Sequence, residues 1–277
     1  MNGLRGRENA PRTMAVLDPS DTADILGYPV SRRGLAGDVD QAMAFWRADD
    51  GQARYVACAN PHSLVVAKGD PLFRDALRNA DILLPDGAGI LLASRVLGLG
   101  ITERVAGTEF FLAVSERANR EGGISYFFLG STGEVLSAIV RRLGADYPNI
   151  RVAGTLSPPY KEEFSADDLA AMVDAVNLAN PDVLWVGMTA PKQEKLLYQV
   201  RERLRVPLVG AIGAVFDFYA GTRKRAPKWV CDLGLEWLPR LLREPRRLWR
   251  RNFVSTPVFL WDLGREAMRR GRRQPSA

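Results

Sequence analysis

Six short apolar runs, separated by stretches with helical periodicity, occupy the middle of this chain. The apolar runs cover residues 55–59, 82–84, 124–129, 150–153, 183–186 and 207–212. The helical stretches cover residues 71–79, 88–97, 109–120, 134–145, 166–178 and 192–204. Short strands that alternate with helices form a mainly parallel sheet with both faces covered. We therefore predict an α/β fold, with a Rossmann-like sheet, helices on both faces and a basic helical C-terminal appendage.

The appendage is predicted from an abrupt change in charge. Residues 222–277 contain 15 Lys and Arg against 5 Asp and Glu, whereas the rest of the chain contains 23 against 27. This segment also holds four of the six tryptophans, which are Trp229, Trp237, Trp249 and Trp261. Arginine beside tryptophan suits an anionic lipid surface, where cations meet phosphates and indoles lie at headgroup depth. A last helix is expected from Pro257, with Ser255 or Thr256 as its N-cap.

Three regions are expected along the chain. They are an N-terminal extension over residues 1–24, expected to be disordered, an α/β domain over 25–220 and the appendage over 221–277. Residues 1–13 lack the apolar segment of a secretory signal. The longest apolar run, residues 206–220, contains glycines and an aspartate and is too short to span a bilayer. We expect a cytoplasmic protein that binds peripherally to the inner face of the cytoplasmic membrane.

Metal and cofactor sites have few residues to build on. Cys58 and Cys231 lie far apart in the sequence and His62 is the single histidine, which almost excludes a zinc site of Cys and His. The one D-x-D triplet, beginning at Asp38, precedes the first core strand. The turn that begins at Asn60 lacks the G-x-G-x-x-G pattern of dinucleotide-binding proteins. We expect neither a metal nor a cofactor.

Asp86 is the main candidate for catalysis. It follows the second apolar run and precedes a helix, so its carboxylate is expected at the carboxyl edge of the sheet, where ligands bind in such folds. There it is suited to act as a general base toward an acceptor hydroxyl. The structural alternative is strong, because Asp before a glycine such as Gly87 is a common turn and N-cap device.

Other turns present polar groups at the same edge. The glycine turn that begins at Gly130 offers backbone N–H groups to phosphate oxygens, although such turns are frequent. Lys192 and Gln193 either reach a nucleotide or sugar, or form only a polar first turn after Pro191. His62 is a candidate base or phosphate contact, or a loop histidine with local hydrogen bonds.

The arginines of the appendage recur at helical spacing. They are Arg240, Arg243, Arg247, Arg250 and Arg251. If the segment is helical they share one face, and a dense face of like charges is destabilising by itself. Phosphates of lipid headgroups or of a diphosphate leaving group would relieve that repulsion. The alternative is a solvated face.

Taken in order, these segments resemble the WecG/TagA/CpsF family of glycosyltransferases over about residues 25–253. The shared marks are Asn60-Pro61, Ala80-Asp81 through Pro85-Asp86-Gly87, Arg95 with Gly98, Glu103-Arg104-Val105-Ala106-Gly107, Phe128-Leu129-Gly130, Gly187 with Pro191-Lys192-Gln193-Glu194, Gly213 with Phe216-Asp217, Ala220-Gly221 with Arg225-Ala226-Pro227, and Gly234-Leu235-Glu236-Trp237 with Arg240, Glu244-Pro245 and Arg247. Nine such marks in register are highly specific.

The resemblance implies site residues. Asp86 would be the catalytic base, and Asn60 and Gln193 would line the substrate pocket. On the appendage, Arg240, Arg247 and Arg250 would close over the site and neutralise the departing diphosphate. The substrate-binding positions that the motifs further imply are Gly87, Arg104, Gly130, Gly187, Lys192 and Asp217.

The chain departs from the family pattern at two positions beside Asn60. Cys58 and His62 stand where the family often has a threonine and an acidic residue. A hydroxyl contact to substrate is thereby in question, and His62 is a candidate to contact a different sugar.

The resemblance also implies a reaction. It is an inverting, metal-independent transfer of a sugar from a UDP-sugar donor to a polyprenyl-diphosphate-linked acceptor, in exopolysaccharide or cell-surface glycan synthesis. An N-acetylmannosaminyl, glucosyl or glucuronosyl group would be transferred. The expected partners are these substrates and an anionic membrane surface, without nucleic acid, and a homo-oligomer is left open. Two alternatives remain, a non-catalytic nucleotide- or lipid-binding membrane module and a nucleic-acid-binding protein that uses the basic tail.

Overall fold

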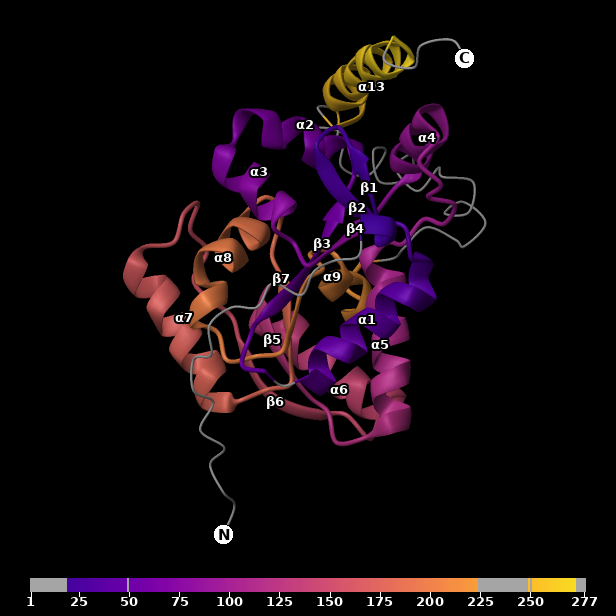
Figure 1. The fold of residues 1–277 in the computed structure, drawn as a ribbon. Helices are drawn as coiled ribbons and strands as arrows, with labels where there is room; N and C mark the ends of the chain where they lie inside the picture. The colour runs from indigo at the N-terminus through magenta and orange to yellow at the C-terminus, as the bar shows by residue number, and fades with distance from the viewer. Residues whose placement is uncertain (1–18, 49, 224–248, 250, 273–277) are drawn as a thin grey trace.

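The structure is a computed structural model that describes residues 19–48, 50–223, 249 and 251–272. Its centre is a six-stranded sheet in the order β4-β3-β8-β7-β5-β6, in which every neighbouring pair is parallel (Figure 1). The strands are β3 (Arg54–Ala59), β4 (Ile82–Pro85), β5 (Ser125–Gly130), β6 (Arg151–Leu156), β7 (Val183–Gly187) and β8 (Leu208–Ala211). Each lies on a predicted apolar run, so the predicted parallel α/β fold is confirmed.

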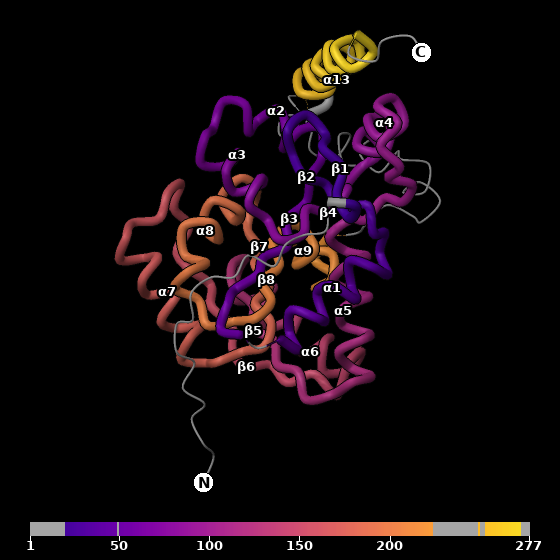
Figure 2. The backbone as a smooth tube through the Cα atoms, viewed as in Figure 1, coloured from indigo at the N-terminus to yellow at the C-terminus, as the bar shows by residue number. Residues whose placement is uncertain are grey.

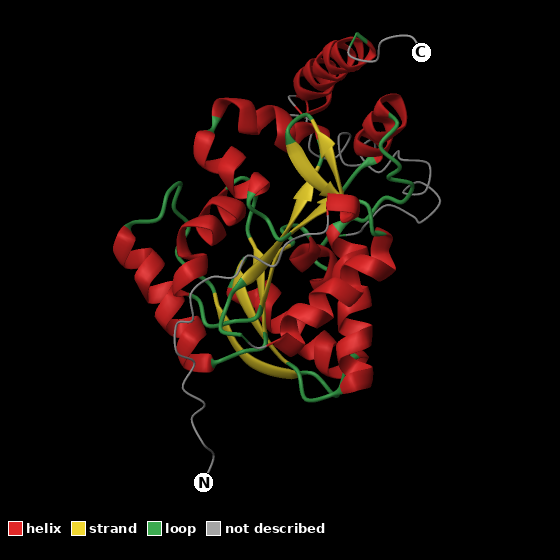
Figure 3. Ribbon diagram, in the orientation of Figure 1, coloured by secondary structure: helices red, strands yellow, loops and turns green. Residues whose placement is uncertain are grey.

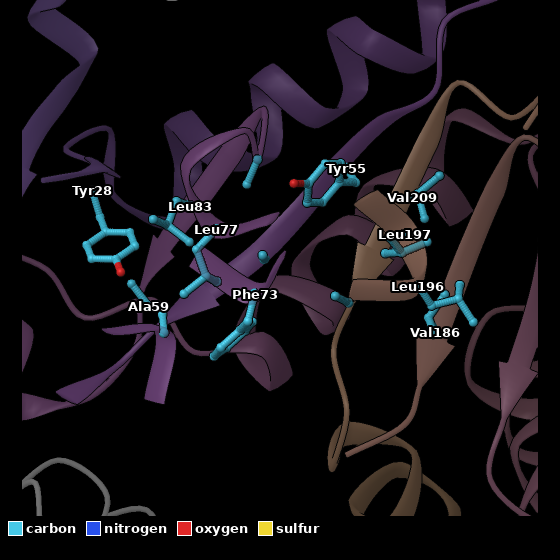
Figure 4. Packing of buried hydrophobic residues seen from close by; sticks show 14 of the residues in the cluster. Tyr28, Tyr55, Ala59, Phe73, Leu77, Leu83, Val186, Leu196, Leu197 and Val209 are labelled. Atoms are coloured by element: carbon cyan, nitrogen blue, oxygen red, sulfur yellow. The ribbon is translucent and has the colours of Figure 1, made fainter. Parts of the chain in front are cut away.

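Helices cover both faces of this sheet (Figure 3). The first face carries α2 (Pro61–Gly69), α3 (Pro71–Arg78), α7 (Ala166–Ala179) and α8 (Lys192–Val200), and the second carries α1 (Gly34–Ala48), α5 (Gly107–Glu121), α6 (Gly133–Asp146) and α9 (Val215–Ala220). Side chains along each strand alternate between the two cores, since Tyr55 and Ala57 join the first and Val56 joins the second. Figure 4 shows the first core, in which Leu196 lies beside Val186.

Several elements fall outside the predicted pattern, including α1, α2, α9 and a separate antiparallel pair. That pair consists of β1 (Thr22–Ile25) and β2 (Tyr28–Ser31), and it follows the 3-10 turn Pro19–Asp21. Ile25 and Tyr28 are buried in the first core. The boundary predicted after residue 24 therefore lies inside β1, and residues 19–24 belong to the fold. Unlike the core strands, β1 and β2 do not lie on continuous apolar runs, so the sequence pattern did not reveal them.

The carboxyl-terminal helix α13 (Thr256–Gly271) follows a π-helical turn, Arg251–Ser255, and begins close to the predicted position. Its Phe259 and Leu263 are buried in the first core. The backbone tube shows α13 beside α2, at one end of the molecule (Figure 2). Ser255 has helical backbone angles and makes no side-chain cap, contrary to one of the two caps considered.

Two ion pairs anchor α13 to the rest of the fold. Lys68 of α2 lies 2.8 Å from Asp262, and Arg270 lies 3.4 Å from Asp24 of β1. The neighbouring helix α4 (Ala88–Leu97) contacts both β1 and α13. Among the described residues, no helix combines the length and the apolar content needed to cross a bilayer.

Candidate functional site

The carboxyl ends of β3 and β4 form a corner from which the chain leaves in two directions. After β3 it enters α2 on the first face, and after β4 it leads through α4 to α5 on the second. In parallel α/β sheets, ligands bind at the carboxyl ends of the strands where the chain diverges in this way. The Asp86 N–H donates to the carbonyl of Ala59 over 2.8 Å, and a Cβ placed on Gly87 would lie 3.9 Å from the Cβ of Asn60. The structure therefore brings Asn60, Asp86 and Gly87 together.

Asn60 is held rigidly at this corner by a capping box at the start of α2. Its Oδ1 accepts the N–H of Ser63 over 3.0 Å, and the Ser63 hydroxyl accepts the N–H of Asn60 over 2.8 Å. A cap of this kind stabilises a helix by about 1 kcal/mol. The cap uses only Oδ1, so the side-chain amide group of Asn60 is available to donate to a ligand.

Asp86 is half-buried, and its charge acts on Cys58 of β3. Burial, followed by the nearby Asp86 carboxylate, raises the pKa of the Cys58 thiol well above its usual value. The thiol therefore stays neutral near pH 7 and accepts a hydrogen bond from the backbone N–H of Gly107. A neutral, engaged thiol is a poor nucleophile, which leaves the carboxylate as the basic group here.

Arg104 reaches the same corner through the loop between α4 and α5. The next residue, Val105, donates its N–H to the carbonyl of Pro85 over 3.0 Å. The Arg104 guanidinium pairs with Glu109 at 3.6 Å and is mostly buried. Asn60, Asp86, Gly87 and Arg104 are called the β3–β4 corner below.

A second group of predicted residues lies at the carboxyl ends of β5 and β7. Gly130 and Gly187 stand opposite each other in the sheet. A Cβ on Gly187 would overlap the ring of Phe216, and one on Gly130 would come within 2.7 Å of the Gly187 carbonyl oxygen. Close packing alone therefore requires both glycines. The packing does not test whether their backbone groups also contact the substrate.

The polar side chains after β7 are engaged inside the protein. The buried Gln193 accepts the N–H of Met188 over 3.3 Å and donates to Glu194 over 2.8 Å. Lys192 donates to the backbone carbonyl of Lys161, and its ammonium lies 4.0 Å from the ring centre of Phe164. Gly130, Gly187, Gln193 and Glu194 are called the β5–β7 corner below. Asp217, on α9, pairs with Arg223 at 3.4 Å.

Glu194 is a candidate that the sequence alone did not single out. Its side chain is buried, its Oε1 accepts from Gln193, and its Oε2 has no hydrogen-bond partner in the described part of the chain. Burial raises the pKa of Glu194 to about 7. The available signal was an acidic residue in the first turn of a helix that follows a fully buried strand.

The D-x-D triplet is unsuited to hold a metal. Asp38 is buried in α1, where its carboxylate accepts from the hydroxyl of Ser31 over 2.5 Å, and burial raises its pKa to about 6. Asp40 is exposed and pairs with Arg117 at 3.4 Å. Across residues 19–48, 50–223, 249 and 251–272, no cluster of three His, Cys, Asp or Glu side chains could bind a metal ion.

The appendage reaches the rim of the β3–β4 corner through His62. The Nδ1 of His62, in the first turn of α2, lies 2.8 Å from the hydroxyl of Ser255. Residues 251–271 thus touch the helix whose N-cap is Asn60. The predicted diphosphate-binding arginines lie outside the described residues; they are Arg240, Arg247 and Arg250.

Known proteins are similar in sequence to this chain over most of its length. The model of the family described as "Glycosyl transferase WecG/TagA/CpsF family" matches residues 23–273. A protein of Bacillus subtilis (strain 168) is 31% identical over 88% of this chain and 92% of its own length. One of Bacillus spizizenii is 29% identical over 76% of this chain and 79% of its own length. One of Staphylococcus aureus (strain MW2) is 26% identical over 91% of this chain and 96% of its own length. All three are named N-acetylglucosaminyldiphosphoundecaprenol N-acetyl-beta-D-mannosaminyltransferase.

Proposed function

We propose a specific reaction for this chain, which belongs to the WecG/TagA/CpsF family and is therefore a glycosyltransferase. It transfers a sugar from a UDP-sugar to a sugar carried on a polyprenyl diphosphate, with inversion at the anomeric carbon. The names of the relatives support a polyprenyl-diphosphate-linked acceptor. The observation that carries the proposal is the meeting of Asn60 and Asp86 at the carboxyl ends of β3 and β4.

In this reaction Asp86 is the general base. The acceptor hydroxyl oxygen bonds to the anomeric carbon as the bond from that carbon to the UDP oxygen breaks. The hydroxyl proton passes to the Asp86 carboxylate, and UDP leaves from the opposite side of the sugar. Proton removal by a placed carboxylate contributes roughly 10²- to 10⁴-fold to the rate. Asn60, fixed by its cap, donates its amide to the sugar.

The leaving diphosphate needs positive charge as it departs. We assign this role to Arg240, Arg247 and Arg250, which follow in the chain after the body and precede the anchored helix α13. The contact between His62 and Ser255 supports this, because it holds the following part of the appendage against α2. Arg104 and Gly87 bind the substrates at the same corner, and the backbone of Gly130 and Gly187, with Lys192, Gln193 and Asp217, binds the nucleotide side.

The donor sugar is proposed to be N-acetylmannosamine, as the names of the relatives suggest. Glucose and glucuronic acid remain the competing donors, since Cys58 and His62 alter the surroundings of Asn60. The test is a screen of the three UDP-sugars for release of UDP, with and without a polyprenyl-diphosphate-linked N-acetylglucosamine. Release that depends on the acceptor, and an inverted anomer by NMR, are expected. No acceptor-dependent release with any donor would refute the proposed reaction.

The enzyme is further proposed to work at the inner face of the cytoplasmic membrane, bound by its appendage. The outward face of α13 carries Arg265, Arg269 and Arg272 together with Trp261. Cations and indole suit a surface of anionic lipid. A lipid-linked acceptor would be met at that surface.

A further inference from the structure

The outward face of helix α4 is apolar although it is exposed to solvent. Only Ser94 and Arg95 are polar among its residues, and Ser94 is buried. The exposed positions include Leu92 at 40% and Val96 at 49%, one turn apart. A surface helix normally turns polar residues outward, whereas a helix that is apolar all round is buried in protein or in lipid. The apolar face of α4 therefore calls for an occupant.

The same end of the molecule concentrates exposed apolar side chains from the appendage. Helix α13 contacts α4, and both lie at the end where β3 and β4 terminate (Figure 1). Eight of the eleven large apolar side chains exposed among the described residues lie on α4 or in residues 249–268. They are Leu92, Val96, Trp249, Phe253, Val254, Leu260, Trp261 and Met268. Patches of this kind mark interaction surfaces.

The charged residues around this apolar patch are mainly arginines, which favour an anionic partner. Arg95, Arg265 and Arg272 are exposed beside the apolar residues. The acidic residues of α13 are already paired, Asp262 with Lys68 at 2.8 Å and Glu266 with Arg269 and Arg270 at 2.9 and 2.8 Å. α4 carries no acidic residue. An apolar surface rimmed by arginine complements an anionic bilayer.

We propose that α4, residue 249 and residues 251–272 form one lipid-contact surface, with Leu92 and Val96 of α4 entering the headgroup region of an anionic bilayer. This adds a second membrane element, far from the appendage in sequence, and it rests on the proposed function only for its biological purpose. Asp86 stands two residues before the first residue of α4, and Leu92 stands four residues after it. The carboxylate is thereby placed close to the proposed surface, where a lipid diphosphate would present its sugar.

The test compares three full-length proteins by co-sedimentation with vesicles of phosphatidylcholine and phosphatidylglycerol. The double variant Leu92→Ser/Val96→Ser should lose at least roughly tenfold in affinity, because it removes several aliphatic carbon atoms and the loss of about two buried methylene groups already has that effect. The control is Leu178→Ser, because Leu178 is 89% exposed on α7, outside the patch. It should bind like the unaltered protein. Equal binding of all three would overturn the proposal.

A second variant guards against misfolding. Arg95→Glu reverses an exposed charge on α4, so it should fold normally and lose affinity for these vesicles. Unchanged affinity of this variant would also contradict the proposal. Loss of thermal stability in the double variant without loss of vesicle binding would mean that residues 224–248 cover α4. A change in oligomeric state without loss of vesicle binding would mean that a second copy does.

Measurements of UDP release distinguish a failure of the lipid-contact proposal from a failure of the proposed reaction. With a short-chain, water-soluble acceptor diphosphate, the double variant should release UDP at the unaltered rate. With a long-chain acceptor embedded in vesicles, it should slow in proportion to its lost binding. If the unaltered protein releases no UDP with either acceptor, the reaction is refuted, while the sedimentation result still decides the lipid surface.

Discussion

The two corners of the carboxyl edge differ in how their side chains are held. At the β3–β4 corner, the capping bond of Asn60 uses its Oδ1 and does not use its side-chain NH2 group. A backbone hydrogen bond fixes the position of Asp86. At the β5–β7 corner, glycines are required by packing, and Gln193 and Glu194 bond to each other. Motif residues alike in the sequence thus separate into a reactive corner and a supporting corner. Substitutions at the first are expected to act on the chemical step, and substitutions at the second on stability and on binding of the nucleotide.

The largest effect is expected at the reactive corner. Asp86→Asn removes the base but keeps the shape, so kcat should fall by roughly 10²-fold or more, while UDP binding and thermal stability stay close to those of the unaltered enzyme. Asp174→Asn is the matched control, since Asp174 is exposed on α7. Steady-state kinetics with titration of UDP checks this. An unchanged kcat would remove Asp86 from the mechanism.

At the supporting corner, Gly187→Ala should act on stability. The added Cβ would overlap the Phe216 ring, and such overpacking costs about 1–3 kcal/mol in the free energy of unfolding. The control is Gly144→Ala on α6, where a Cβ meets nothing within 4 Å and alanine favours the helix. Urea unfolding measures both. A stable but inactive Gly187→Ala enzyme would mean that this corner takes part in turnover itself.

A pH series sharpens the same contrast. Because burial raises the pKa of Glu194 from 4.5 to about 7, the unfolded chain loses this proton first. Folding stability should therefore fall as the pH rises from about 4.5 through about 7, by an amount on the order of 3 kcal/mol at about 1.4 kcal/mol per unit of pKa difference. Glu194→Gln should flatten this slope, although not fully, because the raised pKa of Asp38 acts in the same direction.

The measurement is urea unfolding at several pH values, with Glu162→Gln as the control on an exposed loop residue. A slope that survives unchanged in Glu194→Gln would show that this carboxyl is not the buried titrating group.

The smallest effect is expected for Lys192→Met. The ammonium is held by the Lys161 carbonyl and the Phe164 ring, and a cation–π contact of this kind is worth about 0.5–1 kcal/mol. The variant should lose about that much stability, with a change in KM for the donor of a few fold. A much larger rise in KM, with stability unaltered, would mean that Lys192 contributes to donor binding and not to the fold.

Sequence patterns were sufficient for the strands of the central sheet and for placing Asn60 and Asp86 at its carboxyl edge. Both follow from periodicity and from the rule that parallel strands end at one edge. The helix α2 was missed because it starts directly at Pro61 inside an apparent turn. The engagement of Gln193 and the burial of Glu194 depend on how α8 packs, which no local pattern records.

The order of the strands has a consequence for how this enzyme is made. β8, the last strand along the chain, lies in the middle of the sheet between β3 and β7. Until residue 211 has left the ribosome, the segments on either side have no strand to join them. Contacts so distant in sequence form slowly, and chains truncated before β8 would present two unpaired edges prone to aggregate. The six strands can therefore form one sheet only after β8 has been synthesised.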